Sequence, residues 1–223
     1  MWAWNPTYGL VCQVMTQQAS REATKRETRE ALVTAGMLEF AEHGLDAPSL
    51  DQICARAGKT RGAFYVHFAD RDELLAAVVE RVLTTFYDAV ITSGDRADSL
   101  QQTVAAYIAA VDADVPGTRN RGPWRFGHTL AACARSPAVR QRYAALQSEA
   151  IARVTHTARV GQRAGTVRAD VAAERLGELL VLLTLGISAM RQIGAPFDLH
   201  GGAAALARLL APATPRRRSK HRA

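Results

Sequence analysis

Cysteine is scarce in this sequence of 223 residues, and no run of apolar residues is long. The three cysteines, Cys12, Cys54 and Cys133, form no CxxC pair, which argues against a disulfide scaffold or a zinc site. The longest apolar stretch, residues 179–190, is shorter than the roughly 20 residues that a membrane-spanning helix needs. The N-terminus lacks the charged and apolar regions of a signal peptide. We therefore expect a cytoplasmic protein that does not contact a membrane.

Acidic residues are missing from the last twelve positions, "PATPRRRSKHRA", which carry five Lys or Arg. The whole chain has a net charge of +7, so 7 − 5 = +2 remains for residues 1–211. Residues 1–70 contain seven Lys or Arg and eight Asp or Glu, so net charge alone does not identify a nucleic-acid-binding domain. We interpret the tail as a solvated, disordered end, with sequence-independent attraction to phosphate as the alternative.

Runs of β-branched residues are also rare, whereas alanine, leucine and arginine are plentiful, and this composition favours helix. Apolar residues recur at helical spacing, no internal repeat is found, and the predicted fold is all-α. We expect a flexible extension over residues 1–23, with Met15 as an alternative start, a helix-turn-helix domain over 24–70, a regulatory domain over 71–211 and a basic tail over 212–223. Helices are predicted at about 26–43, 50–57, 60–68, 71–90, 99–112, 125–135, 137–163, 171–193 and 202–211.

Two helix starts lie close together after residue 48. Ser49 is followed three residues later by Gln52, which is the pattern of a capping box. Gly58 ends that helix after about two turns, and Thr60 can cap the next one. Two short helices joined by so tight a turn predict a helix-turn-helix unit.

The stretch "TRGAFYVHF", residues 60–68, fits the recognition helix of such a unit. At helical spacing Phe64 and Phe68 share one side and can pack on the core, while Arg61 and Tyr65 share another and can face DNA. Arg61 can donate two hydrogen bonds to a guanine edge. Other donors can reach phosphates, and Gly62 lets another backbone approach closely. The residues that we predict to contact DNA are Ser49, Lys59, Thr60, Arg61, Gly62, Tyr65 and His67.

Residues 28–75 resemble the DNA-binding domain of the tetracycline-repressor (TetR) family. The most specific part of the resemblance is "FYVHF" followed by "DRDELL". It implies a transcriptional regulator with a second, helical domain that dimerises and holds a small-molecule pocket. The matching residues are Leu32, Phe40, Gly44, Ser49, Ile53, Ala57, Gly58, Gly62, Tyr65, His67, Phe68 and Leu74.

The chain departs from the family pattern at a few positions. Gly36 stands where alanine is usual, which weakens the first helix by up to about 1 kcal/mol unless close packing compensates. Ala63 replaces a threonine or serine that often touches DNA. Arg71 replaces a lysine and keeps the charge, and Cys54 replaces an alanine.

The larger domain offers candidates for the pocket and for the dimer interface. The segment "PWRFGHTLAAC", residues 123–133, is rich in aromatics, and the helix at 171–193 is apolar almost all round its middle. A partner subunit would bury that helix, and the alternative is burial inside the monomer. The predicted pocket residues are Phe86, Tyr87, Tyr107, Trp124, Phe126, His128 and Cys133. The predicted interface residues are Leu176, Leu180, Leu183 and Ile187.

No set of acids, bases, nucleophiles or metal ligands converges in the sequence, so we expect no catalytic residues, no metal and no cofactor. The predicted function is sequence-specific regulation of transcription by a homodimer. We expect it to be a repressor that leaves a palindromic, double-stranded DNA operator when a small apolar or aromatic ligand binds. The alternatives are an activator, a regulator without a ligand, or a small helical enzyme with an incidental helix-turn-helix corner.

Overall fold

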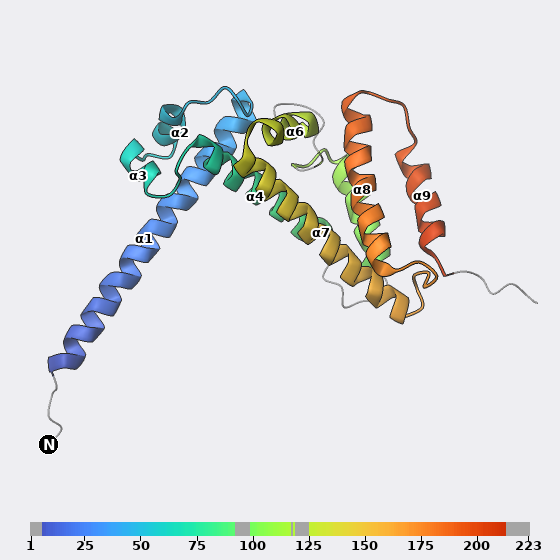
Figure 1. The fold of residues 1–223 in the computed structure, drawn as a ribbon, viewed down its shortest axis with the longest axis horizontal. Helices are drawn as coiled ribbons and strands as arrows, with labels where there is room; N and C mark the ends of the chain where they lie inside the picture. The colour runs from blue at the N-terminus through green and yellow to red at the C-terminus, as the bar shows by residue number, and fades with distance from the viewer. Residues whose placement is uncertain (1–5, 92–98, 117, 119–124, 213–223) are drawn as a thin grey trace, which may run out of the picture. The chain divides into compact units, whose positions relative to one another are not determined.

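The computed structural model describes the backbone of residues 6–91, 99–116, 118 and 125–212, and side chains from residue 18 onward except that of Ser99. Every regular element in these ranges is a helix, which confirms the predicted all-α class (Figure 1). The predictions for Trp124 and for residues 213–223 of the tail lie outside the described residues. The helices are α1 (Pro6–His43), α2 (Leu50–Arg56), α3 (Arg61–Tyr65), α4 (Arg71–Val90), α5 (Ser99–Asp112), α6 (Phe126–Arg135), α7 (Pro137–Arg163), α8 (Ala173–Gln192) and α9 (Leu199–Leu210).

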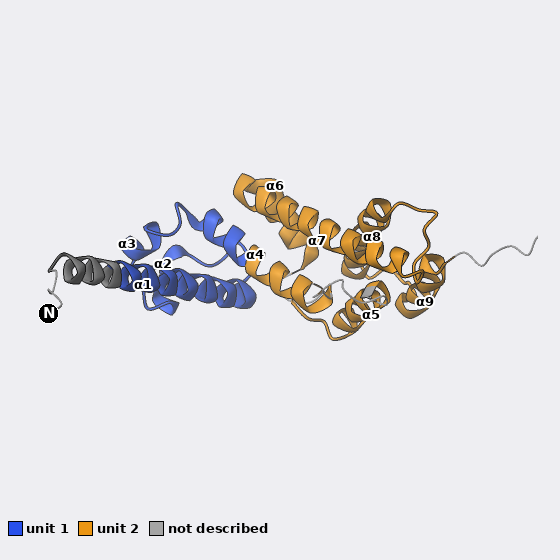
Figure 2. Cartoon of the chain, turned by 90° about the horizontal axis from the view of Figure 1, so that it is seen from below, with its two compact units in different colours: residues 1–78 blue, residues 79–223 orange. Residues whose placement is uncertain are grey.

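The chain divides into two compact units, residues 1–78 and 79–223, which we call unit 1 and unit 2 (Figure 2). The division falls inside α4, eight residues beyond the boundary that we predicted after residue 70. The reason is that the first two turns of α4 supply Leu74, Leu75 and Val78 to the core of unit 1. Among the described residues, no helix is long and apolar enough to cross a membrane.

The tight connection between α2 and α3 follows from three local signals. Ser49 and Gln52 form both hydrogen bonds of the capping box, with Ser49 N donating to Gln52 Oε1 at 2.7 Å. Gly58 ends the turn with a φ of +62°, a conformation that favours glycine. Thr60 then caps α3, because its hydroxyl accepts from Ala63 N at 3.2 Å. The predicted turn is therefore present.

The core of unit 1 is aromatic, and the partly buried Arg71 packs against it. Phe40, Phe64 and Phe68 are at most 2% exposed, as the sequence predicts. Arg71 stacks its guanidinium 5.0 Å from the Phe40 ring centroid and donates to the Pro48 carbonyl at 2.9 Å. The arginine that departs from the family pattern thus ties α4 to the loop before α2.

Helix α1 begins at Pro6, about twenty residues before the predicted start, so the extension predicted to be flexible is helical from that point (Figure 1). The apolar pattern failed to show this because periodicity reports the face that a helix buries, and residues 18–27 are all exposed. Alanine, glutamine, glutamate, lysine and arginine dominate that segment, and these residues favour helix without burial.

Unit 2 is built around the antiparallel pair α7 and α8. Gly177 of α8 lies where an added Cβ would come within 3.0 Å of the Ile151 carbonyl oxygen of α7. Only glycine permits so close an approach of the two backbones. The core includes Leu146, Ala150, Val154, Leu176 and Leu180, and α4, α5 and α9 complete it.

Candidate DNA interface and interior cavity

One side of the segment that contains α3, residues 60–68, is buried in the core of unit 1. The Phe64 side chain has no exposed surface, and its ring lies 5.5 Å from that of Phe68, measured between centroids. This packing fixes the rotation of α3 about its axis. The opposite side therefore faces solvent by necessity.

That outer side carries Arg61, Gly62 and Tyr65, as the spacing predicts. Tyr65 is 54% exposed and meets Phe64 edge to face at 5.4 Å between centroids. Arg61 Nε lies 3.3 Å from the Asp51 carboxylate of α2, and both side chains are largely exposed. A pair so exposed contributes little to stability, so Arg61 can exchange Asp51 for a base edge.

Gly62 has open space around it. An added Cβ would meet nothing nearer than Thr60 Oγ1 at 3.8 Å, so the packing of the described chain does not require glycine here. Ser49 and Thr60 are exposed, and their hydroxyls accept cap hydrogen bonds while each keeps a proton to donate. Lys59 is partly buried at the turn, where its backbone N–H donates to the Cys54 carbonyl.

His67 lies at the C-terminal end of the segment and is partly buried. Burial lowers the pKa of its imidazole below the ordinary value, and the charges of Lys25 and Arg29 on α1 lower it further. The ring is therefore neutral at pH 7 and can donate one hydrogen bond. Sequence reasoning missed these two cations, although their spacing of four residues was visible.

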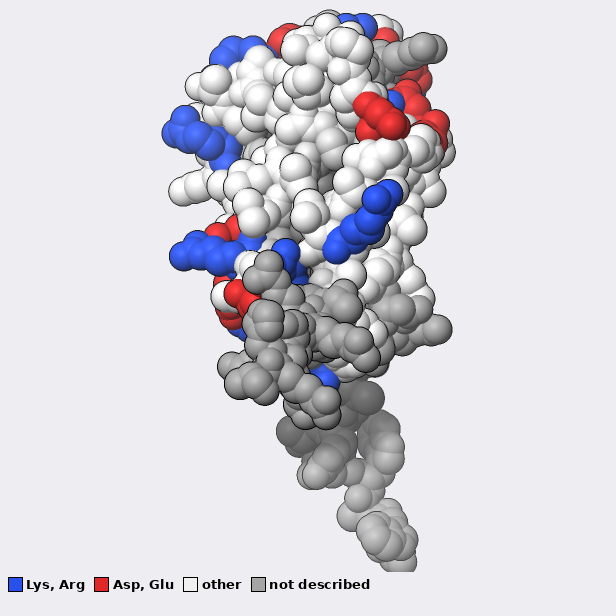
Figure 3. Space-filling model, turned by 90° about the vertical axis from the view of Figure 1, so that its right-hand side faces the viewer, with Lys and Arg blue, Asp and Glu red and all other residues white. Residues whose placement is uncertain are grey.

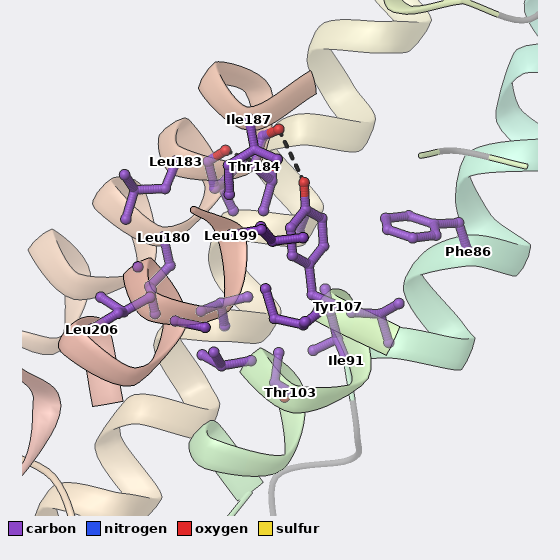
Figure 4. A pocket seen from close by; sticks show the side chains of 18 of the residues that line it. Phe86, Ile91, Thr103, Tyr107, Leu180, Leu183, Thr184, Ile187, Leu199 and Leu206 are labelled. Atoms are coloured by element: carbon purple, nitrogen blue, oxygen red, sulfur yellow. Dashed lines mark hydrogen bonds between the residues drawn. The ribbon is translucent and has the colours of Figure 1, made fainter. Parts of the chain in front are cut away.

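Unit 2 encloses a cavity of about 260 Å³ (Figure 4). Three of the predicted pocket residues, Phe86, Tyr87 and Tyr107, line it. Figure 4 shows Phe86 pointing in from α4 and Tyr107 reaching from α5 toward α8. Sequence reasoning missed most of the remaining lining, which includes Ile91, Thr103, Val154, Thr184, Leu199 and Leu206.

The polar groups of the cavity are few, and apart from Asp198 they are neutral. Tyr107 Oη donates to the Thr184 carbonyl at 3.1 Å, and Gln147 Nε2 donates to Tyr87 Oη at 2.9 Å. Burial raises the pKa of both phenols to about 12, so they keep their protons at neutral pH. No Lys, Arg or His is found among the lining residues of the described chain, and the one acid, Asp198, caps α9.

The structure places the other predicted pocket residues elsewhere. Phe126, His128 and Cys133 lie on α6, which contributes no residue to the cavity wall. Cys133 is buried, and burial raises the pKa of its thiol. The aromatic content of residues 123–133 pointed to a pocket, but α6 packs against α7 and α8 outside the cavity. Trp124 is not among the described residues.

The predicted interface residues divide between two faces of α8. Leu176 and Leu180 are at most 9% exposed and pack in the core of unit 2, while Ile187 lines the cavity. The chain itself therefore buries Leu176 and Leu180, which is the alternative that the sequence left open, and it covers Ile187 in part. Leu183 also lines the cavity and is 46% exposed. The exposed apolar side chains of α8 and its C-cap are Leu179, Leu182, Leu183, Met190 and Ile193.

Comparison with known proteins agrees with this arrangement. Residues 32–78 match the family described as bacterial regulatory proteins, tetR family. Over 168 residues the chain is 24% identical to the HTH-type transcriptional repressor BepR of Brucella suis biovar 1 (strain 1330), covering 74% of this chain and 80% of BepR.

Two solved structures share the fold. The reduced form of E. coli NemR aligns with a TM-score of 0.67 over 82% of this chain and 98% of NemR, at 18% identity. The complex of SmeT with triclosan aligns with a TM-score of 0.55 over 82% of this chain and 83% of SmeT, at 26% identity. SmeT is the repressor of the Stenotrophomonas maltophilia multidrug efflux pump SmeDEF.

The geometry of α2 and α3 and these matches place the chain among the helix-turn-helix regulators of transcription that bind DNA. Within that class, residues 32–78 match the tetR family of bacterial regulatory proteins, and this match confirms the resemblance predicted for residues 28–75.

Proposed function

We propose that the protein is a homodimeric repressor that binds a palindromic operator and leaves it when an uncharged, apolar or aromatic small molecule enters the cavity of unit 2. The observation that carries the proposal is the division of α3 into a fully buried aromatic side and an exposed side with Arg61, Gly62 and Tyr65. We assign the protein no catalytic activity, and as a regulator of bacterial genes it acts in the cytoplasm.

On DNA, the exposed side of α3 enters the major groove. Arg61 donates to a guanine edge, and Tyr65 packs beside it on the same face. Lys59 and the hydroxyls of Ser49 and Thr60 hold phosphates and fix the position of the helix. Neutral His67 donates to a phosphate at the end of the segment.

Dimerisation is supported by the outer face of α8. Leu179, Leu182 and Ile193 are 55%, 60% and 75% exposed, and they recur with Gly186 and Ala189 at helical spacing. Figure 3 shows the side of unit 2 where α9 lies, on which areas without charged side chains alternate with single Lys or Arg side chains. A second copy would cover such an apolar face by a two-fold contact, and this symmetry matches a palindromic operator.

The dimer has a direct test in matched substitutions. Leu182→Glu places a charge in the proposed interface, and we expect it to give monomers in sedimentation velocity and to weaken operator binding. Leu130→Glu on α6, at a leucine that is 45% exposed, is the control and should leave the dimer intact. Equal assembly of both variants would place the interface elsewhere.

The chemistry of the cavity supports an uncharged ligand. Among the described residues, its wall offers apolar surface, two protonated phenols and the carboxylate of Asp198, and no cation to balance a carboxylate or a phosphate. Burial of an unpaired ionised carboxylate is strongly unfavourable. The complex of SmeT with triclosan gives a suitable first probe for this chain.

Helix α4 gives a route from ligand to DNA. Its first turn is held in unit 1 by Arg71, while Phe86, Tyr87 and Val90 near its other end line the cavity. A ligand that contacts these three side chains can favour one setting of α4 over another. Release from DNA then requires that the ligand bind the non-binding arrangement more tightly.

The experiment that tests the proposal is fluorescence anisotropy with DNA from around the protein's own gene and excess nonspecific competitor. We expect tight, competitor-resistant binding that Arg61→Ala and Tyr65→Ala each weaken about tenfold or more, since a lost base contact is worth about 1–3 kcal/mol. Triclosan should then raise the thermal midpoint and weaken operator binding. A neutral alcohol should stabilise the protein more than the carboxylate of equal chain length.

Two results would contradict it. Weak binding that is the same for the wild type and both variants would remove α3 as the reader of sequence. A compound that stabilises the protein without changing operator affinity would separate the cavity from DNA binding. A transcription assay on the same operator distinguishes repression from activation.

A further inference from the structure

The N-terminal half of α1 carries three cations on one face. Arg21, Lys25 and Arg29 are four residues apart, so they lie one above another along the helix, and all three are exposed. We call these three residues the α1 ridge. Glu27 lies between Lys25 and Arg29 in sequence and therefore points to the opposite side.

The cations of the α1 ridge are available to a partner. In the part of the chain that the structure describes, neither Arg21 nor Lys25 has a carboxylate within 4.0 Å. Glu22 is the acid beside the ridge by sequence position, and it too forms no ion pair there. The ridge is therefore not a solvated network of paired charges, which is the usual state of a charged helix face.

The ridge ends at the recognition segment, within the same unit. The Arg29 guanidinium carbon lies 5.2 Å from the ring centroid of Phe68, and Lys25 and Arg29 are close enough to His67 to act on its imidazole. Figure 1 shows α1 continuing past α2 and α3 toward its N-terminus. Within the described part of the chain, the ridge thus begins at Arg29, which contacts Phe68, and continues away from the recognition segment through Lys25 and Arg21, which have no carboxylate partner.

We propose that the α1 ridge is a second DNA contact, which binds backbone phosphates that flank the base pairs read by α3. The proposed partner of the recognition segment is DNA, which is a polyanion. Its phosphates beyond the base pairs that α3 contacts would lie beside the α1 ridge. The contact is electrostatic and independent of sequence, because phosphate oxygens carry no sequence information. It lengthens the footprint of each subunit and strengthens binding to operator and random DNA alike.

The salt dependence of binding measures this contact directly. For duplex DNA the slope of log K against log salt changes by about 0.9 for each phosphate neutralised, which corresponds to about eightfold in affinity for each contact at 0.1 M salt. The test variant is Arg21→Gln, Lys25→Gln and Arg29→Gln combined in the full chain. We expect its slope to be shallower by up to about 2.7 for each subunit bound.

A control variant with the same change in charge is available in unit 2. Arg140, Arg163 and Arg208 are exposed and form no ion pair among the described residues, so their combined replacement by glutamine also removes three positive charges. Its slope should stay within error of the wild type. A third variant, Arg21→Lys with Arg29→Lys, keeps the charges and should keep the wild-type slope. Circular dichroism confirms that each variant is folded.

The outcomes separate this proposal from the proposed function. Equal weakening on operator and random DNA by the ridge variant, with the control unchanged, supports the ridge as a phosphate contact. An unchanged slope, or an equal loss in the control, overturns it. If the wild type shows no operator preference, the proposed function fails, yet the slope on random DNA still tests the ridge. Shortening the DNA on both sides of the operator should weaken binding by the wild type and leave binding by the ridge variant unchanged. The opposite result would also overturn the proposal.

Discussion

Unit 1 presents its candidate site outward, whereas unit 2 encloses its candidate site. In unit 1 a buried aromatic side of α3 fixes which residues face solvent, so adjacent residues differ sharply in exposure. In unit 2 five helices contribute to a cavity, and the residues that line it are chemically the same as those of the surrounding core. A surface site can therefore be altered without affecting the fold, while a change in an interior site also changes packing.

The largest expected effect comes from comparing alanine substitutions at two adjacent residues of unit 1, Phe64 and Tyr65. Phe64 has no exposed surface, so Phe64→Ala should lower the free energy of unfolding by about 3–5 kcal/mol and abolish DNA binding with it. Tyr65 is 54% exposed, so Tyr65→Ala should change stability by less than about 0.5 kcal/mol while weakening operator binding about tenfold. Thermal unfolding and anisotropy measure both.

The contrast fails if Tyr65→Ala destabilises the protein as much as Phe64→Ala does. Tyr65 would then be a core residue through its edge-to-face contact with Phe64, and its loss could not report on DNA. The control is a compound that stabilises the wild type: it should also stabilise unit 2 of the Phe64→Ala variant, because the cavity contains no residue of unit 1.

The same contrast explains what the sequence predicted well. Caps, a turn glycine and aromatic spacing act over four or fewer residues, so Ser49, Gly58, Thr60 and Phe64 could be assigned from their neighbours alone. The helix boundaries of unit 2 were also close, because apolar periodicity and Pro or Gly breaks are local signals.

The cavity could not be predicted in the same way. Which apolar residues enclose a space and which fill it depends on how α4, α5, α7, α8 and α9 pack, and no local pattern contains that information. The aromatic content of residues 123–133 therefore drew attention to α6, which lies outside the cavity wall. The N-terminal half of α1 was missed for a different reason. It is exposed and has no apolar period, although its residues have strong helix propensity.

The second prediction compares two buried alanines on α7. Ala150 lines the cavity, whereas Ala158 is fully buried and does not. Ala150→Leu should extend into the cavity, cost less than about 1.5 kcal/mol and block ligand-induced stabilisation. Ala158→Leu should overpack the core, cost about 1–3 kcal/mol and leave ligand binding intact if the protein stays folded. Similar losses of stability in both variants would mean that the cavity has no usable room at Ala150.

The third prediction uses the two phenols of the cavity. Their folded pKa of about 12 lies above the ordinary value of about 10, so the unfolded chain loses these protons first as pH rises. Their contribution to stability is thus fully present below pH 10 and is lost as the pH approaches 12, on the order of 2 kcal/mol for each. With only three lysines in the chain, Lys25, Lys59 and Lys220, tyrosine ionisation should dominate this range.

Phenolate absorbance during alkaline titration, with urea unfolding at each pH, measures this effect. Tyr107→Phe removes one of the two cavity ionisations, while the partly buried Tyr143, whose pKa burial also raises, remains, so the decline in stability between pH 10 and 12 should become shallower. A decline that is as steep in Tyr107→Phe and in Tyr87→Phe as in the wild type would show that water reaches the cavity phenols.

The smallest expected effect returns to the surface of unit 1. Arg61 and Asp51 are 3.3 Å apart with both side chains largely exposed, so Asp51→Asn should change the free energy of unfolding by less than about 1 kcal/mol. In the proposed complex Arg61 must leave Asp51 to reach a base. The substitution removes this competing partner and also removes a negative charge close to DNA. Operator affinity should therefore rise, on the order of twofold to fivefold, and the gain should shrink as salt increases. Asp51→Asn combined with Arg61→Ala is the control, because the share of the gain that depends on Arg61 disappears in the double variant. If the double variant kept the whole gain, Asp51 would act only by repelling phosphate. The proposed contact between Arg61 and a base edge would then be contradicted.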